Sequence, residues 1–327
     1  MRRRQFIAGL AGTLVTPGIS FAQRTRMRVI GVIAGGPQPK DIQSSGYGSI
    51  PKGLAELGYV EGQDFTIEWR FANGHYDRFP EFAAEMVRLN VDVIVLPATG
   101  QIPDVQKATS TIPIVMGHAV DPVGNGFVKS LARPGGNITG LAASSDDAVP
   151  KLLELIKACV PNLSKLGVLA YPNSPTTVAT LKTLRSSVER IGTEIVLAGP
   201  RDLNEIEQSL AILADQKVAA LYVVSDTIYY GNRQRLADLA LLHRMPAAFS
   251  QQEYVEAGGL LSYGEKLADF WRRSTVYIDK IFKGAKPSDL PVEQPTRFHL
   301  LINLKTAKTL SIEMPGVVLA AADEVIE

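Results

Sequence analysis

Cysteine and histidine are scarce in this chain of 327 residues. The single cysteine, Cys159, excludes an intrachain disulfide framework and a cysteine-rich metal cluster. Its apolar neighbours predict that it packs in the core. The four histidines, His75, His118, His243 and His299, lie far apart and form no His-x-x-x-His pair. The sequence therefore predicts neither a metal site nor a bound cofactor.

A charge excess, long apolar runs and the common catalytic motifs are also missing. The chain has 34 Lys and Arg residues against 33 Asp and Glu residues, whereas nucleic-acid binders carry a concentrated basic excess. No apolar stretch reaches the roughly 20 residues that a transmembrane helix needs. Neither a serine-hydrolase elbow nor a phosphate-binding loop occurs. We therefore predict no nucleic-acid partner and no enzymatic activity.

The first 22 residues have the layout of a secretory signal peptide. Arg2–Arg4 form a basic start, Phe6–Val15 are weakly apolar, and Ser20–Ala22 form a small-x-small cleavage signal. The segment Arg3–Ile7 also resembles a twin-arginine export signal, with the general secretory route as the alternative. The apolar run is too short for a membrane anchor. We predict export to the periplasm, with cleavage after Ala22.

The remainder of the chain repeats one order of strands and helices at a distance of about 130 residues. In the first copy, apolar runs predict strands at 28–33, 65–71, 91–96 and 112–116, with helices near 44–57, 77–89 and 101–109. In the second copy, strands are predicted at 165–170, 194–197, 218–224 and 245–249, with helices near 175–191, 203–216 and 232–243. Alternating strands and helices predict parallel sheets. We expect an α/β fold with two doubly wound, Rossmann-like lobes.

Several motifs resemble one known family. They are Leu57–Gln63, Tyr76–Pro80, Asp121–Val123, Leu131–Gly140, Gly258–Gly264, Asp289–Pro295 and Ile302–Ala307. Together they look like the solute-binding component of an ABC importer, in the family that includes tryptophan- and tyrosine-binding proteins. The resemblance covers essentially the whole chain. It implies a type I periplasmic-binding-protein fold, with two lobes, three crossing strands and a ligand in the cleft.

The crossings between the lobes can be placed on the sequence. Asn137–Ala143, Gly258–Tyr263 and Leu290–Pro295 are expected to cross, because the helical pattern at Phe270–Phe282 comes too late for the second lobe and should return to the first. The predicted division is 27–140 plus 264–290 for the N-terminal lobe and 141–263 plus 291–327 for the C-terminal lobe. Gly140, Gly258, Gly259 and Gly264 suit hinges because glycine adopts new backbone angles at little cost, with ordinary turns and bulges as the alternative. The predicted hinge residues are Gly140, Tyr263, Gly264 and Val292.

In open α/β sheets a ligand binds outside the carboxyl ends of the strands. In the first lobe this rule selects Gly35 and Gly36, Ala98 to Gly100, and His118 and Asp121 as ligand-binding residues. Backbone N–H groups at Gly35–Gly36 and Ala98–Gly100 favour an anion, with a tight turn and a helix cap as the alternatives. Asp121 fits either a ligand ammonium or a turn cap.

In the second lobe the same rule selects Asn173, Ser174, Ser225, Asp226, Ser250 and Gln251. Asp226 is the preferred partner for a substrate amine, with a solvated loop acid as the alternative. Glu253 is a further acid that could take an ammonium group. Four tyrosines could form walls of the site or pack elsewhere, namely Tyr47, Tyr171, Tyr229 and Tyr230. Trp69 and Trp271 are interpreted as core residues.

The leading hypothesis is an exported, monomeric receptor that closes two lobes on a small-molecule solute and delivers it to the permease of an ABC importer. We expect an amino acid with an aromatic or aliphatic side chain, or another small carboxylate. One alternative is a two-lobed Rossmann-like enzyme, which would need a catalytic set that the sequence does not contain. Another is the sensor lobe of a transcription regulator, which would need a DNA-binding helix-turn-helix in place of the leader.

Overall fold

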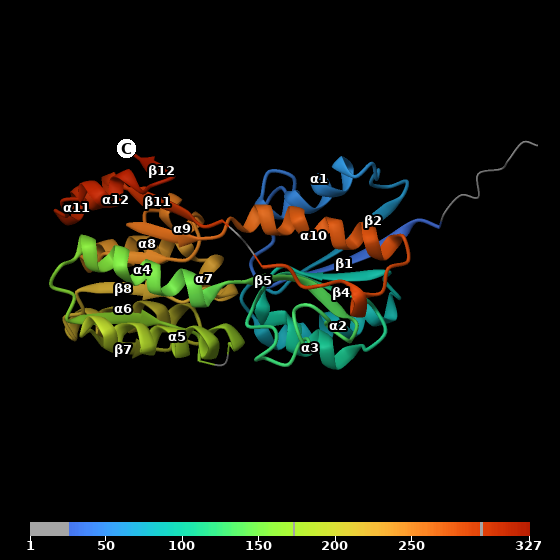
Figure 1. Ribbon diagram of the computed structural model, residues 1–327, viewed down its shortest axis with the longest axis horizontal. Helices are drawn as coiled ribbons and strands as arrows, with labels where there is room; N and C mark the ends of the chain where they lie inside the picture. The colour runs from blue at the N-terminus through green and yellow to red at the C-terminus, as the bar shows by residue number, and fades with distance from the viewer. Residues whose placement is uncertain (1–25, 173, 295–296) are drawn as a thin grey trace, which may run out of the picture.

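The computed structural model describes residues 26–172, 174–294 and 297–327, and the predicted leader with its cleavage point lies outside them. The chain forms two α/β lobes that lie side by side along the long axis (Figure 1). Each lobe has a central, mostly parallel sheet with helices on both faces. The predicted fold class is thereby confirmed. Within the described residues, no helix is long and apolar enough to cross a membrane.

The first lobe is built on a parallel sheet of five strands in the order β2-β1-β3-β4-β5. The strands are β1 (Arg28–Ala34), β2 (Phe65–Phe71), β3 (Val93–Leu96), β4 (Ile114–Val120) and β5 (Ile138–Ala143). The central strands β3 and β4 are buried along their whole length. Strands covered on both faces are continuous apolar runs, and this explains why the sequence pattern located them.

Four longer helices cover this sheet. They are α1 (Ser49–Glu56), α2 (Phe79–Arg88), α3 (Ile102–Ala108) and α10 (Leu267–Phe282), with the short 3-10 turns η1 (Gly46–Gly48), η2 (Tyr76–Arg78), η3 (Thr99–Gln101) and η4 (Pro287–Asp289). Helices α1 and α10 lie on one face and α2 and α3 on the other (Figure 1). Helix α10 comes from the second half of the chain, as its late position predicts.

The second lobe has seven strands in the order β12-β11-β10-β9-β8-β6-β7. The strands are β6 (Lys165–Leu169), β7 (Glu194–Ala198), β8 (Ala220–Val223), β9 (Ala247–Phe249), β10 (Leu261–Gly264), β11 (His299–Asn303) and β12 (Glu324–Ile326). Only the pair β10 and β11 is antiparallel among the described strands. The helices are α4 (Ser145–Cys159), α5 (Pro175–Ile191), α6 (Leu203–Asp215), α7 (Thr227–Tyr230), α8 (Arg233–Leu242), α9 (Glu253–Glu256), α11 (Leu304–Leu310) and α12 (Gly316–Ala320).

The first two predicted crossing segments lie just before the points where the chain leaves each lobe. Asn137–Ala143 is largely β5, which pairs with β4 in the first sheet, so the actual passage is at Ser144. The second passage follows β10, at Glu265 and Lys266.

The first part of the third predicted crossing also lies in the first lobe, and its last residue, Pro295, lies outside the described residues. The Val292 N–H donates to the Leu131 carbonyl (2.7 Å), and the Val292 side chain packs in the first-lobe core. Glu293 forms a bridge to Leu141 beside β5. The segment Leu290–Glu293 therefore lies against the first sheet, and the chain reaches β11 only after it. The predicted lobe boundaries and the predicted hinge residues stay predictions.

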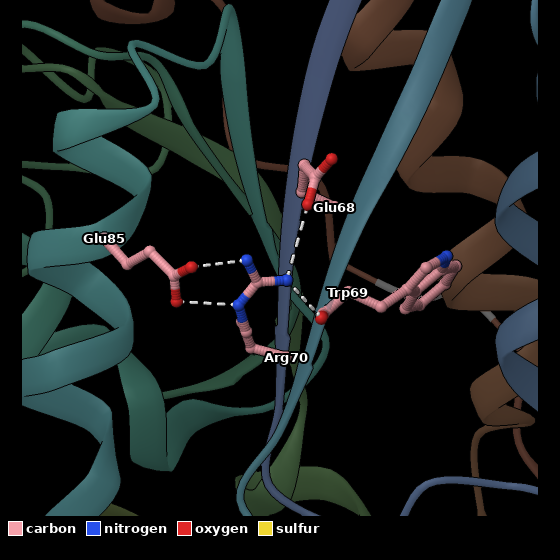
Figure 2. Close-up of polar contacts among 4 residues, drawn as sticks. All are labelled: Glu68, Trp69, Arg70 and Glu85. Carbon is pink, nitrogen blue, oxygen red and sulfur yellow. Dashed lines mark hydrogen bonds and ion pairs between the residues drawn. The ribbon is translucent and has the colours of Figure 1, made fainter.

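An ion pair secures the outer edge of the first sheet. Arg70 of the edge strand β2 makes two hydrogen bonds to Glu85 of α2, at 2.7 Å from Nε and 2.5 Å from Nη2 (Figure 2). Arg70 Nη1 also donates to the Trp69 carbonyl at 2.7 Å and lies 3.4 Å from Glu68 Oε2. Arg70 holds the pKa of Glu85 below its usual value. This bidentate geometry ties the helix to a strand that has a neighbour on one side only.

Candidate functional site

A cavity lies between the lobes, at the carboxyl ends of their strands. The first lobe contributes the loops after β1 and β3 and the end of β4, and the second contributes Ser225–Thr227 after β8. Helix α10 adds Leu267 and Trp271. We call this space the interlobe cavity. Its volume is about 40 Å³, which is room for a few water molecules. A larger solute can therefore enter only after the lobes separate or the lining side chains move.

Eight of the thirteen residues predicted to bind a ligand line this cavity. They are Gly35, Gly36, Ala98, Thr99, Gly100, His118, Ser225 and Asp226. Residues of both lobes that were selected because they follow the carboxyl ends of strands thus lie together in the structure. Whether these residues contact a solute stays a prediction. Asn173 lies outside the described residues.

Four predicted residues do not line the cavity. Asp121 is exposed, has a φ of 43° and accepts a hydrogen bond from the Gly124 N–H (2.8 Å), so it caps its own turn. Ser174 is buried at the N-cap of α5. Gln251 lies behind the cavity wall and donates to Ser225 Oγ (2.6 Å). Ser250 Oγ lies 3.3 Å from the Tyr222 hydroxyl.

Gly35 lies where the two lobes approach each other closely. The side chain of Gln101 is buried and makes two hydrogen bonds to the backbone. Its Oε1 accepts the Gly35 N–H (3.0 Å), and its Nε2 donates to the Ala98 carbonyl. In this arrangement the Gly35 N–H is engaged by Gln101, and contact of Gly35 with a solute stays a prediction. A Cβ at Gly35 would lie 2.5 Å from Thr227 of the opposite lobe, so only glycine permits this contact.

Asp226 links the lobes across the cavity. Its side chain is 7% exposed and caps α7 by accepting the Ile228 N–H (3.1 Å). The Tyr76 hydroxyl of the first lobe lies 2.7 Å from both carboxylate oxygens. Burial raises the pKa of Asp226. Burial and the Asp226 charge raise the pKa of Tyr76 far above its usual value, so Tyr76 donates to Asp226 as a neutral phenol.

Tyr76 makes a second contact across the cleft. Its ring stacks on Tyr171 of the second lobe, with ring centres 4.8 Å apart and planes at 12°. Sequence reasoning did not assign Tyr76 to the site, because Tyr76 lies in η2 after β2 and not at one of the strand ends that were considered. Its place in one of the family motifs was the available signal.

An aromatic wall closes the first-lobe side of the cavity. Tyr47 and Trp271 stack with ring centres 4.7 Å apart and planes at 11°, and Trp271 Nε1 donates to the Pro97 carbonyl (3.0 Å). Trp271, interpreted as a core residue, is buried but also lines the cavity. Tyr230 lines it as well, whereas Tyr229 is buried in the second-lobe core. Trp271 was missed because a tryptophan in a regular helix was assigned to the core, and the sequence does not show which end of α10 meets the cavity.

Two further acids lie near the cavity. Glu265 Oε2 is 3.9 Å from Nε2 of the lining residue His118, and its Oε1 accepts the Ser144 N–H (3.0 Å). Burial alone would raise the pKa of Glu265, but His118 and the Ser144 N–H hold it below its usual value. Burial raises the pKa of Glu253, whose Oε2 is buried without a hydrogen-bond partner in the described part of the chain. With Asp226, these acids make the surroundings favourable for a cation.

Within residues 26–172, 174–294 and 297–327, no three His, Cys, Asp or Glu side chains are grouped so that they could hold a metal ion. Of the acids near the cavity, Asp226 is engaged by Tyr76 and the Ile228 N–H, and Glu265 by the Ser144 N–H. The arrangement is suited to enclosing a small polar molecule between two surfaces.

Comparisons with known proteins agree with this geometry. A curated relative, the tyrosine-binding protein of Clostridioides difficile (strain R20291), is 26% identical over 262 residues, covering 80% of this chain and 75% of the relative. A solved structure of an ABC domain in complex with L-Trp, described as from Streptococcus pneumonia, is 28% identical with a TM-score of 0.83, and covers 92% of this chain and 100% of its own.

A conserved domain protein from Vibrio cholerae is 27% identical with a TM-score of 0.85, over 92% of this chain and 100% of its own. The two-lobed type I periplasmic-binding-protein architecture is therefore confirmed. The family described as ABC transporter substrate binding protein matches residues 40–326. With nearly the whole described chain inside that match, this protein belongs to the ABC transporter substrate binding protein family.

Proposed function

We propose that the protein is the exported receptor of an ABC importer and that its solute is an amino acid, with tryptophan and tyrosine as the first candidates. The observation that carries this proposal is the set of residues that line the interlobe cavity. It places a stacked aromatic pair, Tyr47 and Trp271, opposite a buried carboxylate, Asp226, from the other lobe. A tyrosine-binding relative and an L-Trp complex among the similar structures support the same solute class.

Each end of an amino acid has a matching group in this proposal. The ammonium group pairs with Asp226, because a buried carboxylate gains most from a charged donor. The carboxylate lies near His118 and the backbone of Thr99 and Gly100, which begin η3 ahead of α3. The side chain packs against the wall formed by Tyr47 and Trp271, since aromatic faces bury a large apolar area.

Closure follows from contacts that exist only when the lobes meet. Tyr76 reaches Asp226 and Tyr171 across the cleft, and these contacts are lost when the lobes part. A solute shifts the equilibrium only through a difference in affinity between the open and closed states. A solute that bridges Asp226 and the aromatic wall has that difference, because it touches both lobes only in the closed state.

The partners follow from this role. The protein acts in the periplasm as a monomer, and the closed, loaded form presents both lobes to the permease in the inner membrane. No nucleic acid is involved. Small-angle scattering should show compaction on addition of a bound solute, and identical profiles with and without it would contradict closure.

The solute is tested by calorimetric titration of the mature chain. The panel contains the twenty amino acids together with a hexose, myo-inositol and a nucleoside. We expect binding of tryptophan or tyrosine, and much weaker binding of their decarboxylated amines if the carboxylate is recognised. Binding of a sugar or nucleoside with no response to any amino acid would overturn the solute assignment and leave the receptor role standing.

A further inference from the structure

Glu265 stands at the second passage between the lobes, directly after β10 and before α10. Its side chain is buried at 7% exposure, and a buried charge needs compensating partners. It has two, one on the first passage and one in the interlobe cavity. We propose that Glu265 is a positioning residue that couples occupancy of the cavity to the angle between the lobes. This inference rests on the proposed receptor function, whose solute it leaves open.

The first partner ties two passages together. Glu265 Oε1 accepts the backbone N–H of Ser144 at 3.0 Å. Ser144 is the residue between β5 of the first lobe and α4 of the second. One carboxylate therefore holds two of the three connections at a fixed separation, and a rotation of the lobes about these connections must strain or break this bond.

The second partner of Glu265, His118, lines the interlobe cavity. Glu265 Oε2 lies 3.9 Å from His118 Nε2, and His118 lines the cavity from the end of β4. The His118 ring is held edge-on by Phe270 of α10, with ring centres 5.1 Å apart. Glu265 itself does not line the cavity. Any solute group that engages His118 therefore acts on Glu265 through one imidazole ring.

The backbone leaves Glu265 little freedom to adjust. A Cβ on the preceding Gly264 would collide with the Ser250 carbonyl oxygen, so β10 ends in close contact with its neighbour. On its other side, Glu265 borders a second hollow of about 670 Å³ between the lobes, together with Lys266, Arg273 and Glu293. Arg273 is engaged by Glu293 at 2.7 Å. Glu265 thus lies between the interlobe cavity and this second hollow. The shape of the second hollow also depends on the angle between the two lobes.

The coupling requires that the two contacts of Glu265 differ between open and closed states. In the structure, where Tyr76 joins Asp226 across the cleft, both contacts of Glu265 are made at once. Opening moves His118, on the first lobe, relative to Glu265, and releases the Ser144 bond or the His118 contact. A solute that orders His118 restores both contacts and so favours closure. Loss of the carboxylate should leave binding and closure less tightly linked.

The first experiment needs no solute. Two labels are placed on opposite lobes through introduced cysteines, in a Cys159→Ser background, and the interlobe distance distribution is measured for wild type, Glu265→Gln and Glu265→Ala. We expect a broader, longer distribution for Glu265→Ala and an intermediate one for Glu265→Gln, which keeps an acceptor for the Ser144 N–H. Distributions identical to wild type in both variants would overturn the proposal.

The second experiment separates coupling from a merely structural role. Dissociation constants for L-tryptophan and L-tyrosine are measured for Glu265→Gln, His118→Asn and the double variant, with the exposed Glu61→Gln as control. We expect about tenfold weaker binding for each single variant, and a double variant no weaker than His118→Asn alone. Additive losses would contradict action through His118. If wild type binds neither amino acid, the proposed solute fails, whereas the distance distributions still decide the role of Glu265.

Discussion

At the residue scale, the phenol of Tyr76 and the ammonium of a solute would share one carboxylate, Asp226. Replacing Asp226 by Asn keeps the oxygen that caps α7 but removes the charge. We expect the affinity for an ammonium-bearing solute to fall by about 2–5 kcal/mol, because a buried charge loses its partner. Calorimetry gives this value directly. Asp202→Asn is the matched control, since Asp202 is an exposed N-cap in the same lobe.

The raised pKa of Asp226 gives a second prediction. As pH falls, the stability of the free protein and its affinity for an ammonium group should change in opposite directions. Because burial raises this pKa above 3.8 in the folded protein, the folded state takes up the proton at a higher pH than the unfolded state. As pH falls through that window, Asp226 contributes more to the stability of the free protein, while affinity for an ammonium group declines. Stability and affinity measured against pH, as differences between wild type and Asp226→Asn, should change in opposite directions.

At the scale of elements, Gly140 is held by strand pairing. It has a φ of 127°, and an added Cβ would lie 2.6 Å from the Met116 backbone nitrogen on β4. Gly140→Ala should therefore destabilise the protein by at least about 1–3 kcal/mol. Gly136→Ala is the control, because a Cβ there meets nothing within 4 Å. The urea midpoints of the two variants are compared with that of the wild type. Equal midpoints for Gly140→Ala and Gly136→Ala would contradict the prediction, because β5 would then accommodate the added Cβ without loss of stability.

The ion pair of Figure 2 belongs to the same scale. Glu85→Gln should cost about 0.5–1 kcal/mol at neutral pH, because the pair is partly exposed and partly screened. Since Arg70 lowers the folded-state pKa of Glu85, this stability is present above the unfolded pKa and is lost as pH falls through the folded one. Unfolding at pH 7 and at about pH 3 should therefore give a difference that shrinks in acid. Glu81→Gln, exposed on the same helix, should show no such change.

Local signals explain which elements could be predicted. Helix α5 was placed at 175–191 and spans Pro175–Ile191, because proline opens it and Gly192, at a φ of 65°, ends it. Helix α4 was not predicted, since Pro150 interrupts its pattern. The strands β11 and β12 were missed because the repeat contains no counterpart for them.

The site divides in the same way. Strand-end residues such as Thr99 and Ser225 follow from topology, whereas Tyr76 and Trp271 required knowledge of how distant segments pack. Some family motifs have structural explanations instead. Asn303 caps α11 by accepting the Thr306 N–H (3.0 Å), and the Asn137 amide donates to the Ile112 carbonyl (2.8 Å). A motif in the sequence therefore marks a family without marking its ligand.

At the scale of the whole molecule, the amino-terminal leader gives a prediction about export. We expect the exported protein to begin at Gln23, because a small-x-small signal precedes it. Amino-terminal sequencing of secreted protein tests this, and a mature form that retains Arg2 to Arg4 would refute it. Replacing Arg3 and Arg4 by Lys should stop export by the twin-arginine route, whereas unchanged secretion would point to the general route.

The return of α10 to the first lobe has a consequence for the order of synthesis. Phe270 and Ile278 of this helix pack with Ile30 and Val115 of the first sheet. The ribosome completes β5 at Ala143 but reaches Leu267 only 124 residues later, which takes roughly 6–25 s at about 5–20 residues per second. For that interval this face of the first sheet is covered by α1 alone, and the apolar side chains that α10 will bury stay exposed. The amino-terminal lobe can therefore finish folding only after most of the carboxyl-terminal lobe has emerged from the ribosome.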